Sequence, residues 1–320
     1  PELNWKGKYI LSEKEMRKYW ITQRVEENTT LRKKFKNDPQ GLKIAEKLLA
    51  YDTGKKFWKS NEICMRHAEG IRSNTPVLAK LWYFWTNHFT ISDTQSLANF
   101  STGAYQREFI RANMDKKFET MAVDATIAWP MMMHLDNKDN VGPKSKSAKS
   151  EWRRREKKPA TINENHAREL LELHTVSPNA GYTQEDIIEL AKIMTGWRPK
   201  WSKQKDHGHD VSFDTDRHEP GKKTIFGKVY KRGSKSLKIV IKDLANHPSC
   251  REFIATKLCR YLITDNPTKD MITPIIKAWE KSDGYLPEVH KAAIKVAYEY
   301  NDKYQKFQNP ENWWLQMINM

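Results

Sequence analysis

Apolar residues recur at three- and four-residue intervals along most of the chain, which is the spacing of α-helices with one buried face. Over residues 76–89 this pattern predicts a helix whose buried stripe is Leu78, Leu81, Trp82, Trp85 and Phe89. Thr75 followed by Pro76 is typical of a helix start, because proline is favoured at the first helical position. Core packing is the expected role of this stripe.

The same periodicity predicts helices over residues 12–35, 40–58, 102–122 and 129–135, and from about 238 to the end with breaks at 246–248, 264–267 and 282–284. Residues 183–186 resemble a capping box and open another helix, which Gly196 ends. Between 206 and 237, short alternating segments indicate a small β-hairpin. The expected fold class is therefore mostly α, a multi-helix single domain over 1–320 with a β-hairpin excursion around 206–237.

Residues 137–160 are rich in Asn, Gly, Pro, Ser and basic side chains, which is typical of a loop. We interpret them as a basic flexible insertion that is either solvated or the chief contact to a polyanion. Its cationic residues are Lys144, Lys146, Lys149, Arg153, Arg154, Arg155, Lys157 and Lys158.

The net charge of +16 favours anionic partners such as nucleic acid or an acidic envelope polymer, with solubility alone as the alternative. No apolar run approaches the ~18 residues that span a bilayer, so no transmembrane segment is expected. Three cysteines without paired spacing indicate that disulfides do not hold the fold. The start at Pro1 shows no signal peptide, and we expect a processed chain.

Residues 163–174 concentrate polar side chains on one face. Read as a regular helix, they place five polar residues within an arc of roughly 140°, and His174 on the opposite, apolar face. The five are Glu164, Asn165, Arg168, Glu169 and Glu172. Such a face is either a solvated ladder of ion pairs or the wall of an active site.

Four segments together resemble one protein family. Residues 84–92 (FWTNHFTIS) are similar to its signature FWxNHFxxS, and residues 163–175 (NENHARELLELHT) to NENxARELxELxT. Residues 181–197 (GYTQEDIIELAKIMTGW) and 218–227 (HEPGKKTIFG) are similar to two further blocks, in the family's order. The chain from about residue 75 onward therefore resembles the bacterial family called domain of unknown function 1800.

The resemblance implies an exported or periplasmic protein, and it implies no settled reaction. The chain departs from the family pattern in lacking an export signal and in carrying the basic insertion. It also reaches Trp313 and Trp314 where the family usually continues, so we expect a C-terminal truncation.

The clustered carboxylates suggest glycosidic hydrolysis, which needs one protonated and one ionised carboxyl group. Glu164 and Glu172 each lie four residues from Arg168, which would keep them ionised. Glu169 is then the expected general acid, with Glu172 or Glu164 as base, Arg168 as organiser and His88 as a further donor. The alternative is a buried structural network around the same arginine.

The expected substrate-binding residues are Trp85, Asn87, Asn165, Tyr182, Trp197, His218 and Lys223. A metal site of His88, His174, His218 and a glutamate is a second interpretation, although no HExxH motif occurs and His207 with His209 is a weak pair. The leading interpretation needs no cofactor, whereas this one needs a divalent metal.

The sequence thus predicts a hydrolase-like enzyme that acts on a polymeric carbohydrate, neutral or acidic. The alternatives are a non-enzymatic protein that binds nucleic acid or an envelope polyanion, and a metal-dependent enzyme. The sequence gives no oligomeric state.

Overall fold

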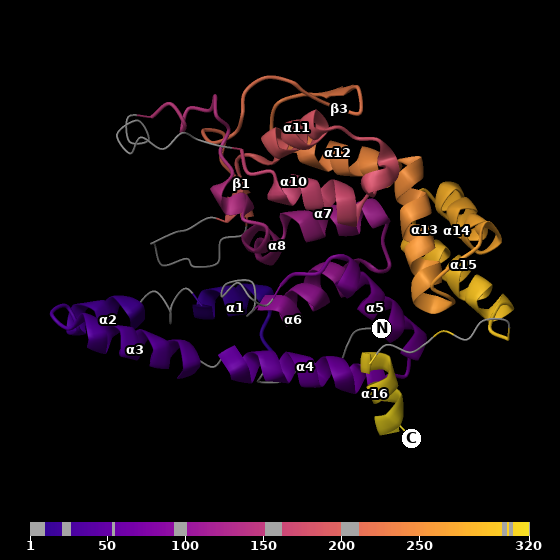
Figure 1. The fold of residues 1–320 in the computed structure, drawn as a ribbon, viewed down its shortest axis with the longest axis horizontal. Coiled ribbons are helices and arrows are strands. Elements are labelled where there is room, and N and C mark those ends of the chain that lie inside the picture. Colours follow the sequence, from indigo (N-terminus) through magenta and orange to yellow (C-terminus); the bar gives the residue numbers. More distant parts are fainter. Residues whose placement is uncertain are drawn as a thin grey trace.

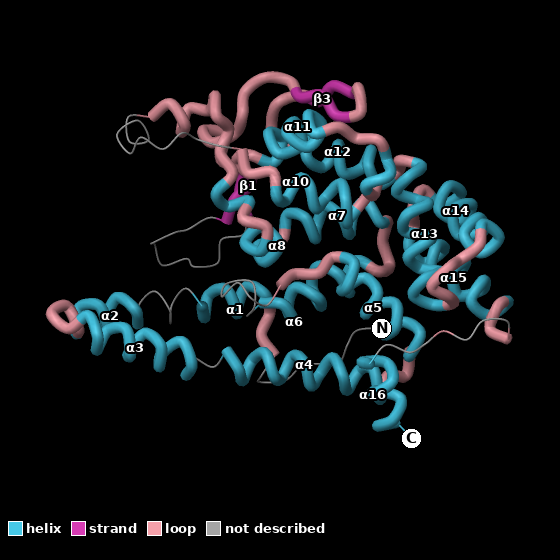
Figure 2. The backbone as a smooth tube through the Cα atoms, in the orientation of Figure 1, coloured by secondary structure: helices cyan, strands magenta, loops and turns pink. Residues whose placement is uncertain are grey.

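The computed structural model describes residues 10–20, 27–52, 55–92, 101–150, 162–199, 211–302, 306 and 310–319. Helices make up most of this structure, and strands are confined to two small antiparallel pairs, as the periodicity predicts (Figures 1 and 2). The predicted mostly α fold class is therefore confirmed.

The N-terminal helices form an elongated layer along one side of the molecule (Figure 1). They are α1 Glu13–Trp20, α2 Glu27–Lys34, α3 Pro39–Asp52 and α4 Lys55–Arg72. The C-terminal helix α16, Pro310–Asn319, packs against α4, so the last helix of the chain joins this N-terminal layer.

The middle of the chain supplies α5 Pro76–His88, α6 Thr102–Tyr105, α7 Phe118–Ile127, α8 Trp129–His134, α10 Asn165–Glu169 and α11 Gln184–Met194. Pro76 and Pro130 lie in the first turns of α5 and α8, as predicted. The capping box of α11 is also confirmed, because Thr183 and Asp186 each accept the other's backbone N–H.

The C-terminal helices are α12 Lys235–Ala245, α13 Pro248–Leu262, α14 Lys269–Ser282 and α15 Leu286–Glu299. The predicted breaks fall between them. Asp283 and Gly284, both at positive φ, form the turn between α14 and α15. Helices α13, α14 and α15 pack on one another at one end of the molecule (Figure 1).

Four short strands form two separate ladders. β1 Trp197–Pro199 pairs with β2 Val211–Phe213, and β3 Lys223–Ile225 pairs with β4 Lys228–Tyr230. Phe226 and Gly227 join β3 to β4 with positive φ at both positions, which is the geometry of a two-residue hairpin turn. The sequence missed β1, because its tryptophan and proline follow directly on a helix.

Two predicted helices differ from the structure. The predicted helix 102–122 is interrupted, since a π turn over Gln106–Ile110 and a 3₁₀ turn over Arg111–Asn113 end it before α7 begins. Residues 163–174 are not one regular helix either: α10 ends at Glu169 and a π-helix follows over Leu170–His174. A π turn contains more residues than an α turn, so side chains after Glu169 are rotated relative to the regular pattern.

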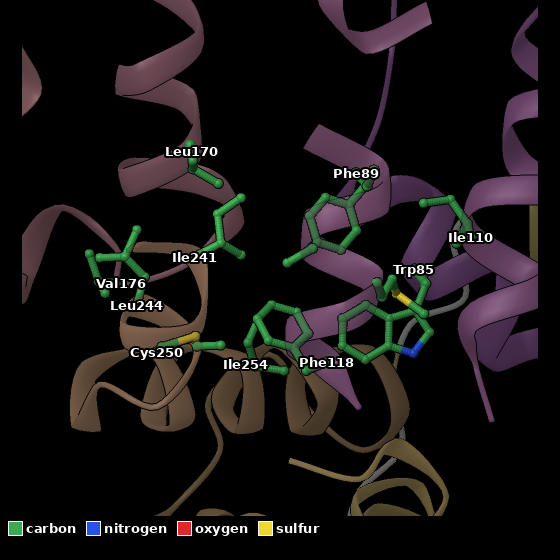
Figure 3. Packing of buried hydrophobic residues seen from close by; sticks show 14 of the residues in the cluster. Trp85, Phe89, Ile110, Phe118, Leu170, Val176, Ile241, Leu244, Cys250 and Ile254 are labelled. Atoms are coloured by element: carbon green, nitrogen blue, oxygen red, sulfur yellow. The ribbon is translucent and has the colours of Figure 1, made fainter. Parts of the chain in front are cut away.

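A large apolar core joins these helices. Figure 3 shows Trp85 of α5 and Phe89, directly after α5, beside Phe118 of α7, with Ile241 of α12 and Ile254 of α13 nearby. Trp85 is fully buried, and its indole N–H donates to Nε2 of His290 at 2.8 Å. This bond links α5 to α15, so the core depends on both halves of the chain.

The first part of the basic 137–160 segment packs against the body. The side-chain amide of Asn137 donates to the carbonyl oxygens of Met194 and Trp197. The side-chain amide of Asn140 donates to the carbonyl oxygen of Ala191. Residues 151–160 of this segment lie outside the described residues.

Candidate functional site

The predicted carboxylate face forms a partly exposed polar cluster on α10 and the following π turn. Arg168 lies at its centre, with Nη2 3.2 Å from Oε2 of Glu164 and Nη1 3.2 Å from Oε1 of Glu172. Gln184, in the first turn of α11, donates to Glu164 at 2.7 Å and accepts from Arg168 at 3.0 Å. We call Glu164, Arg168, Glu169, Glu172, Tyr182 and Gln184 the carboxylate cluster.

Glu169 differs from its two neighbouring glutamates. No ion pair of Glu169 occurs among the described residues, whereas Glu164 and Glu172 share the guanidinium of Arg168. Burial and the charge of Glu172 raise the pKa of Glu169 above its usual value, with Arg168 opposing them. The cluster thus contains a carboxyl group that holds its proton more tightly beside one that is ion-paired with an arginine.

Tyr182 adds a phenol to the cluster. Burial, followed by a hydrogen bond to Glu172, raises the pKa of Tyr182 to about 12. The phenol therefore keeps its proton at neutral pH and donates a hydrogen bond to the carboxylate of Glu172. Asn165, also predicted to bind substrate, is exposed on the first turn of α10.

His88 does not belong to the carboxylate cluster. It is 3% exposed and is surrounded by aromatic rings, among them Phe84, Phe89 and Phe118. Its Nε2 lies 3.1 Å from the carbonyl oxygen of His174. Burial lowers the pKa of His88 most, and Lys257 and His174 lower it further. Trp85, predicted to bind sugar, is likewise in the core and offers no surface to a polymer.

Lys257 of α13 is a residue that the sequence analysis missed. Its Nζ lies 2.8 Å from Nδ1 of His88 and 5.1 Å from the ring centroid of Phe253. Burial lowers the pKa of Lys257 to about 8. Nothing in the local sequence marks this lysine, because its partner is 169 residues away.

Two further histidines, His166 and His174, are buried, and His174 lies beside His88. His174 packs on Phe89 and His88, with ring centroids 5.2 Å and 6.1 Å away. Its Nδ1 and both ring nitrogens of His166 have no hydrogen-bond partner among the described residues. Burial lowers the pKa of His166 and of His174 to about 3, so both imidazoles are neutral at physiological pH.

His218 and Lys223 hold a different part of the chain. His218 lies 2.7 Å from the carbonyl oxygen of Thr195 through Nδ1, and its Nε2 accepts the N–H of Gly233. Lys223 is 1% exposed, and its ammonium donates to the carbonyl oxygens of Glu219 and Gly221. Both residues thus stabilise the segment around the strands from inside.

The predicted site residues therefore fall into separate places. Asn87 is exposed at the end of α5, while Trp197 is nearly buried and packs against Phe213 across the β1–β2 pair. Within the described ranges, no group of three or more His, Cys, Asp or Glu side chains is arranged to hold a metal ion. The weak pair His207 and His209 lies outside those ranges.

These features define a mostly helical protein with a carboxylate cluster at its surface and a lysine–histidine pair inside. The chain belongs to the family described as "Protein of unknown function (DUF1800)", whose family model matches residues 11–320. The match extends the resemblance, noted above from about residue 75, to nearly the whole chain. No curated protein and no solved structure matches the chain. None of the described helices combines the length and apolar character needed to cross a membrane.

Proposed function

We propose that this protein is an exported hydrolase that cleaves glycosidic bonds in a polymeric carbohydrate, with Glu169 as general acid. The supporting observation is the inequality of neighbouring carboxyl groups in the carboxylate cluster. The pKa of Glu169 is raised, whereas Glu172 is paired with Arg168 at 3.2 Å. A carboxyl group with a raised pKa beside a second carboxyl group is the usual arrangement of a glycosidase acid and its partner.

In this proposal Glu169 donates a proton to the oxygen of the leaving sugar, and Glu172 acts as the ionised partner. Arg168 forms ion pairs with Glu172 and Glu164, and Tyr182 orients Glu172 through its hydrogen bond. All of these side chains are at least partly exposed, as a polymer requires.

The test compares the wild type with Glu169→Gln and the matched control Glu185→Gln. Glu185 is an exposed carboxylate of α11, 3.7 Å from Lys192, outside the cluster. Reducing ends are measured after incubation with neutral glucans and with polyuronates. We expect Glu169→Gln to lower the rate about 10²-fold or more, with Glu185→Gln unchanged. Full activity of folded Glu169→Gln, or no release from any polymer by the wild type, contradicts the proposal.

A second candidate function, polyanion binding, is supported by the contact between two basic segments, residues 142–149 and residues 215–235. The N–H groups of Gly142 and Ser147 donate to the carbonyl oxygens of Arg217 and Asp216 at 2.9 and 2.8 Å. Arg232 in turn donates to the carbonyl oxygen of Thr215. These bonds place the exposed cations of both segments on neighbouring surface: Lys144, Lys146, Lys149, Lys231, Arg232 and Lys235.

Retention on immobilised heparin or DNA tests this second function. The triple variant Lys144→Gln, Lys146→Gln, Lys149→Gln should elute at lower salt. Each lost phosphate or sulfate contact weakens the binding and also reduces its dependence on salt concentration. The control removes the same charge from α14 through Lys269→Gln, Lys277→Gln and Lys281→Gln, which are all exposed. Equal loss of retention in both triples shows that only net charge acts.

A further inference from the structure

The buried side of α13 carries an arrangement that the carboxylate chemistry does not use. Lys257, on α13, meets His88, at the end of α5, and His88 in turn meets the backbone carbonyl of His174, at the end of the π turn. Three segments distant in sequence thus bring an amine, an imidazole and a carbonyl oxygen into one hydrogen-bonded row.

The carbonyl oxygen fixes the tautomer of His88. Because a carbonyl oxygen only accepts, the Nε2 of His88 that lies 3.1 Å from it carries the proton. Nδ1 of the neutral ring then has a free lone pair, and it accepts a hydrogen bond from Nζ of Lys257 at 2.8 Å. His88 is therefore oriented as a proton acceptor toward the lysine.

The surroundings of Lys257 favour a nucleophile over a structural cation. Among the described residues no carboxylate pairs with Lys257, whose hydrogen bond goes to the neutral ring of His88. The lysine is partly exposed, while His88 behind it is 3% exposed. An amine beside a base, with the base held by a third group, is the general arrangement of an activated nucleophile.

We propose that Lys257 is a nucleophilic amine, oriented by His88, that forms an imine with an aldehyde or ketone. The ammonium gives one proton to solvent, and the resulting amine, held by its hydrogen bond from Nζ to His88 Nδ1, attacks the carbonyl carbon with its lone pair while the C=O π electrons move to oxygen. After proton transfer from nitrogen to that oxygen, solvent returns one proton to the hydroxyl group. Water leaves as the C=N bond forms, so ammonium and carbonyl compound become iminium and water.

The titratable groups that act on this row lie on several elements. Burial is the largest cause that lowers the pKa of His88, and the charges of Lys257 and His174 lower it further. Burial alone lowers the pKa of Lys257 to about 8. At pH 7 about 10% of such an amine is unprotonated, against less than about 0.1% of a lysine with the ordinary pKa near 10.4. This proposal is independent of the glycosidase proposal.

The chain offers a matched control in Lys223. Burial also lowers the pKa of Lys223 to about 8, but this lysine is 1% exposed and donates to two carbonyl oxygens. A low pKa alone therefore predicts equal reactivity of the two lysines, whereas the proposed arrangement predicts reaction at Lys257 only.

The experiment incubates the full chain at pH 7 with benzaldehyde and sodium cyanoborohydride and maps benzylated lysines by mass spectrometry. We expect Lys257 to be labelled at least about tenfold faster than surface lysines, with half-maximal rate near pH 8, and Lys223 to stay unlabelled. His88→Phe, which keeps an aromatic ring in the core, should reduce the labelling about tenfold or more.

Labelling without preference for Lys257 overturns the proposal, and so does an unchanged rate in folded His88→Phe. If that variant does not fold, the pH profile of the wild type still decides. A labelling rate at Lys257 that rises at the same high pH as that of surface lysines refutes the proposal.

Discussion

The buried histidines 166 and 174 predict a steep loss of stability in mild acid. Burial is the first cause that lowers the pKa of each to about 3. In the unfolded chain a histidine has a pKa of about 6.5. Between these two values the unfolded chain binds more protons than the folded one, so the free energy of unfolding falls as the pH falls from about 6.5 toward 3.

The magnitude follows from the size of this window. Below about pH 6 each such histidine lowers the free energy of unfolding by about 1.4 kcal/mol per pH unit. Between pH 7.5 and pH 5 one histidine removes about 2 kcal/mol, and the pair about 4 kcal/mol. Since a typical domain is stable by only about 5–15 kcal/mol, this loss is large enough to measure by urea unfolding.

The perturbation is His166→Leu, which removes an imidazole that is 1% exposed and has neither ring nitrogen bonded among the described residues. We expect the variant to be at least as stable as the wild type at pH 7.5, because an unpaired buried polar group is lost. At pH 5 it should be more stable by about 2 kcal/mol. Urea titrations followed by far-UV circular dichroism at several pH values measure both differences.

The control is His67→Leu. His67 is only partly buried and lies 3.6 Å from Glu311, so its removal should leave the acid sensitivity in place. Equal slopes of stability against pH in His166→Leu and the wild type would refute the reasoning, because they would show that His166 is protonated without penalty in the folded protein.

Three further changes test the fold. Thr183→Ala removes the capping box of α11 and should cost about 1 kcal/mol in urea unfolding; an unchanged midpoint contradicts the cap. Gly196→Ala should cost about 3 kcal/mol, because Gly196 has φ +89° and a Cβ there would lie 2.6 Å from the carbonyl oxygen of Asp214; a wild-type melting temperature would show that this turn relaxes freely. Trp85→Phe should cost about 3 kcal/mol, since it leaves a cavity and unpairs His290, and calorimetry that finds no loss argues against this buried bond.

The helical elements could be predicted because their signals are local. The proline in the first turn of α5, the capping box of α11 and the breaks around α13 and α14 each depend on a few neighbouring residues. The π turn after Glu169 could not be predicted, because the spacing of polar and apolar residues does not distinguish it from a regular helix. At its end the hydroxyl of Thr175 donates to the carbonyl oxygen of Leu170 and the Ser177 N–H to that of Leu171.

The candidate site could be predicted only where its residues share one helix. The spacing of Glu164, Arg168 and Glu172 gave their ion pairs correctly, since residues four apart face each other. The contact between Lys257 and His88 joins α13 to α5, and no pattern within either segment encodes it. The position of His218 likewise depends on Thr195 and Gly233, which are 23 and 15 positions away in the sequence.

The bond between Trp85 and His290 has a consequence for how the protein is made. The two residues are 205 positions apart, and the N–H of Phe118 also donates to the carbonyl oxygen of Gly284. At about 5–20 residues per second, a ribosome needs roughly 10–40 s between synthesising the indole and its partner. During that interval the nascent chain carries an incomplete aromatic interior, and exposed apolar surface of this kind is what makes folding intermediates prone to aggregate.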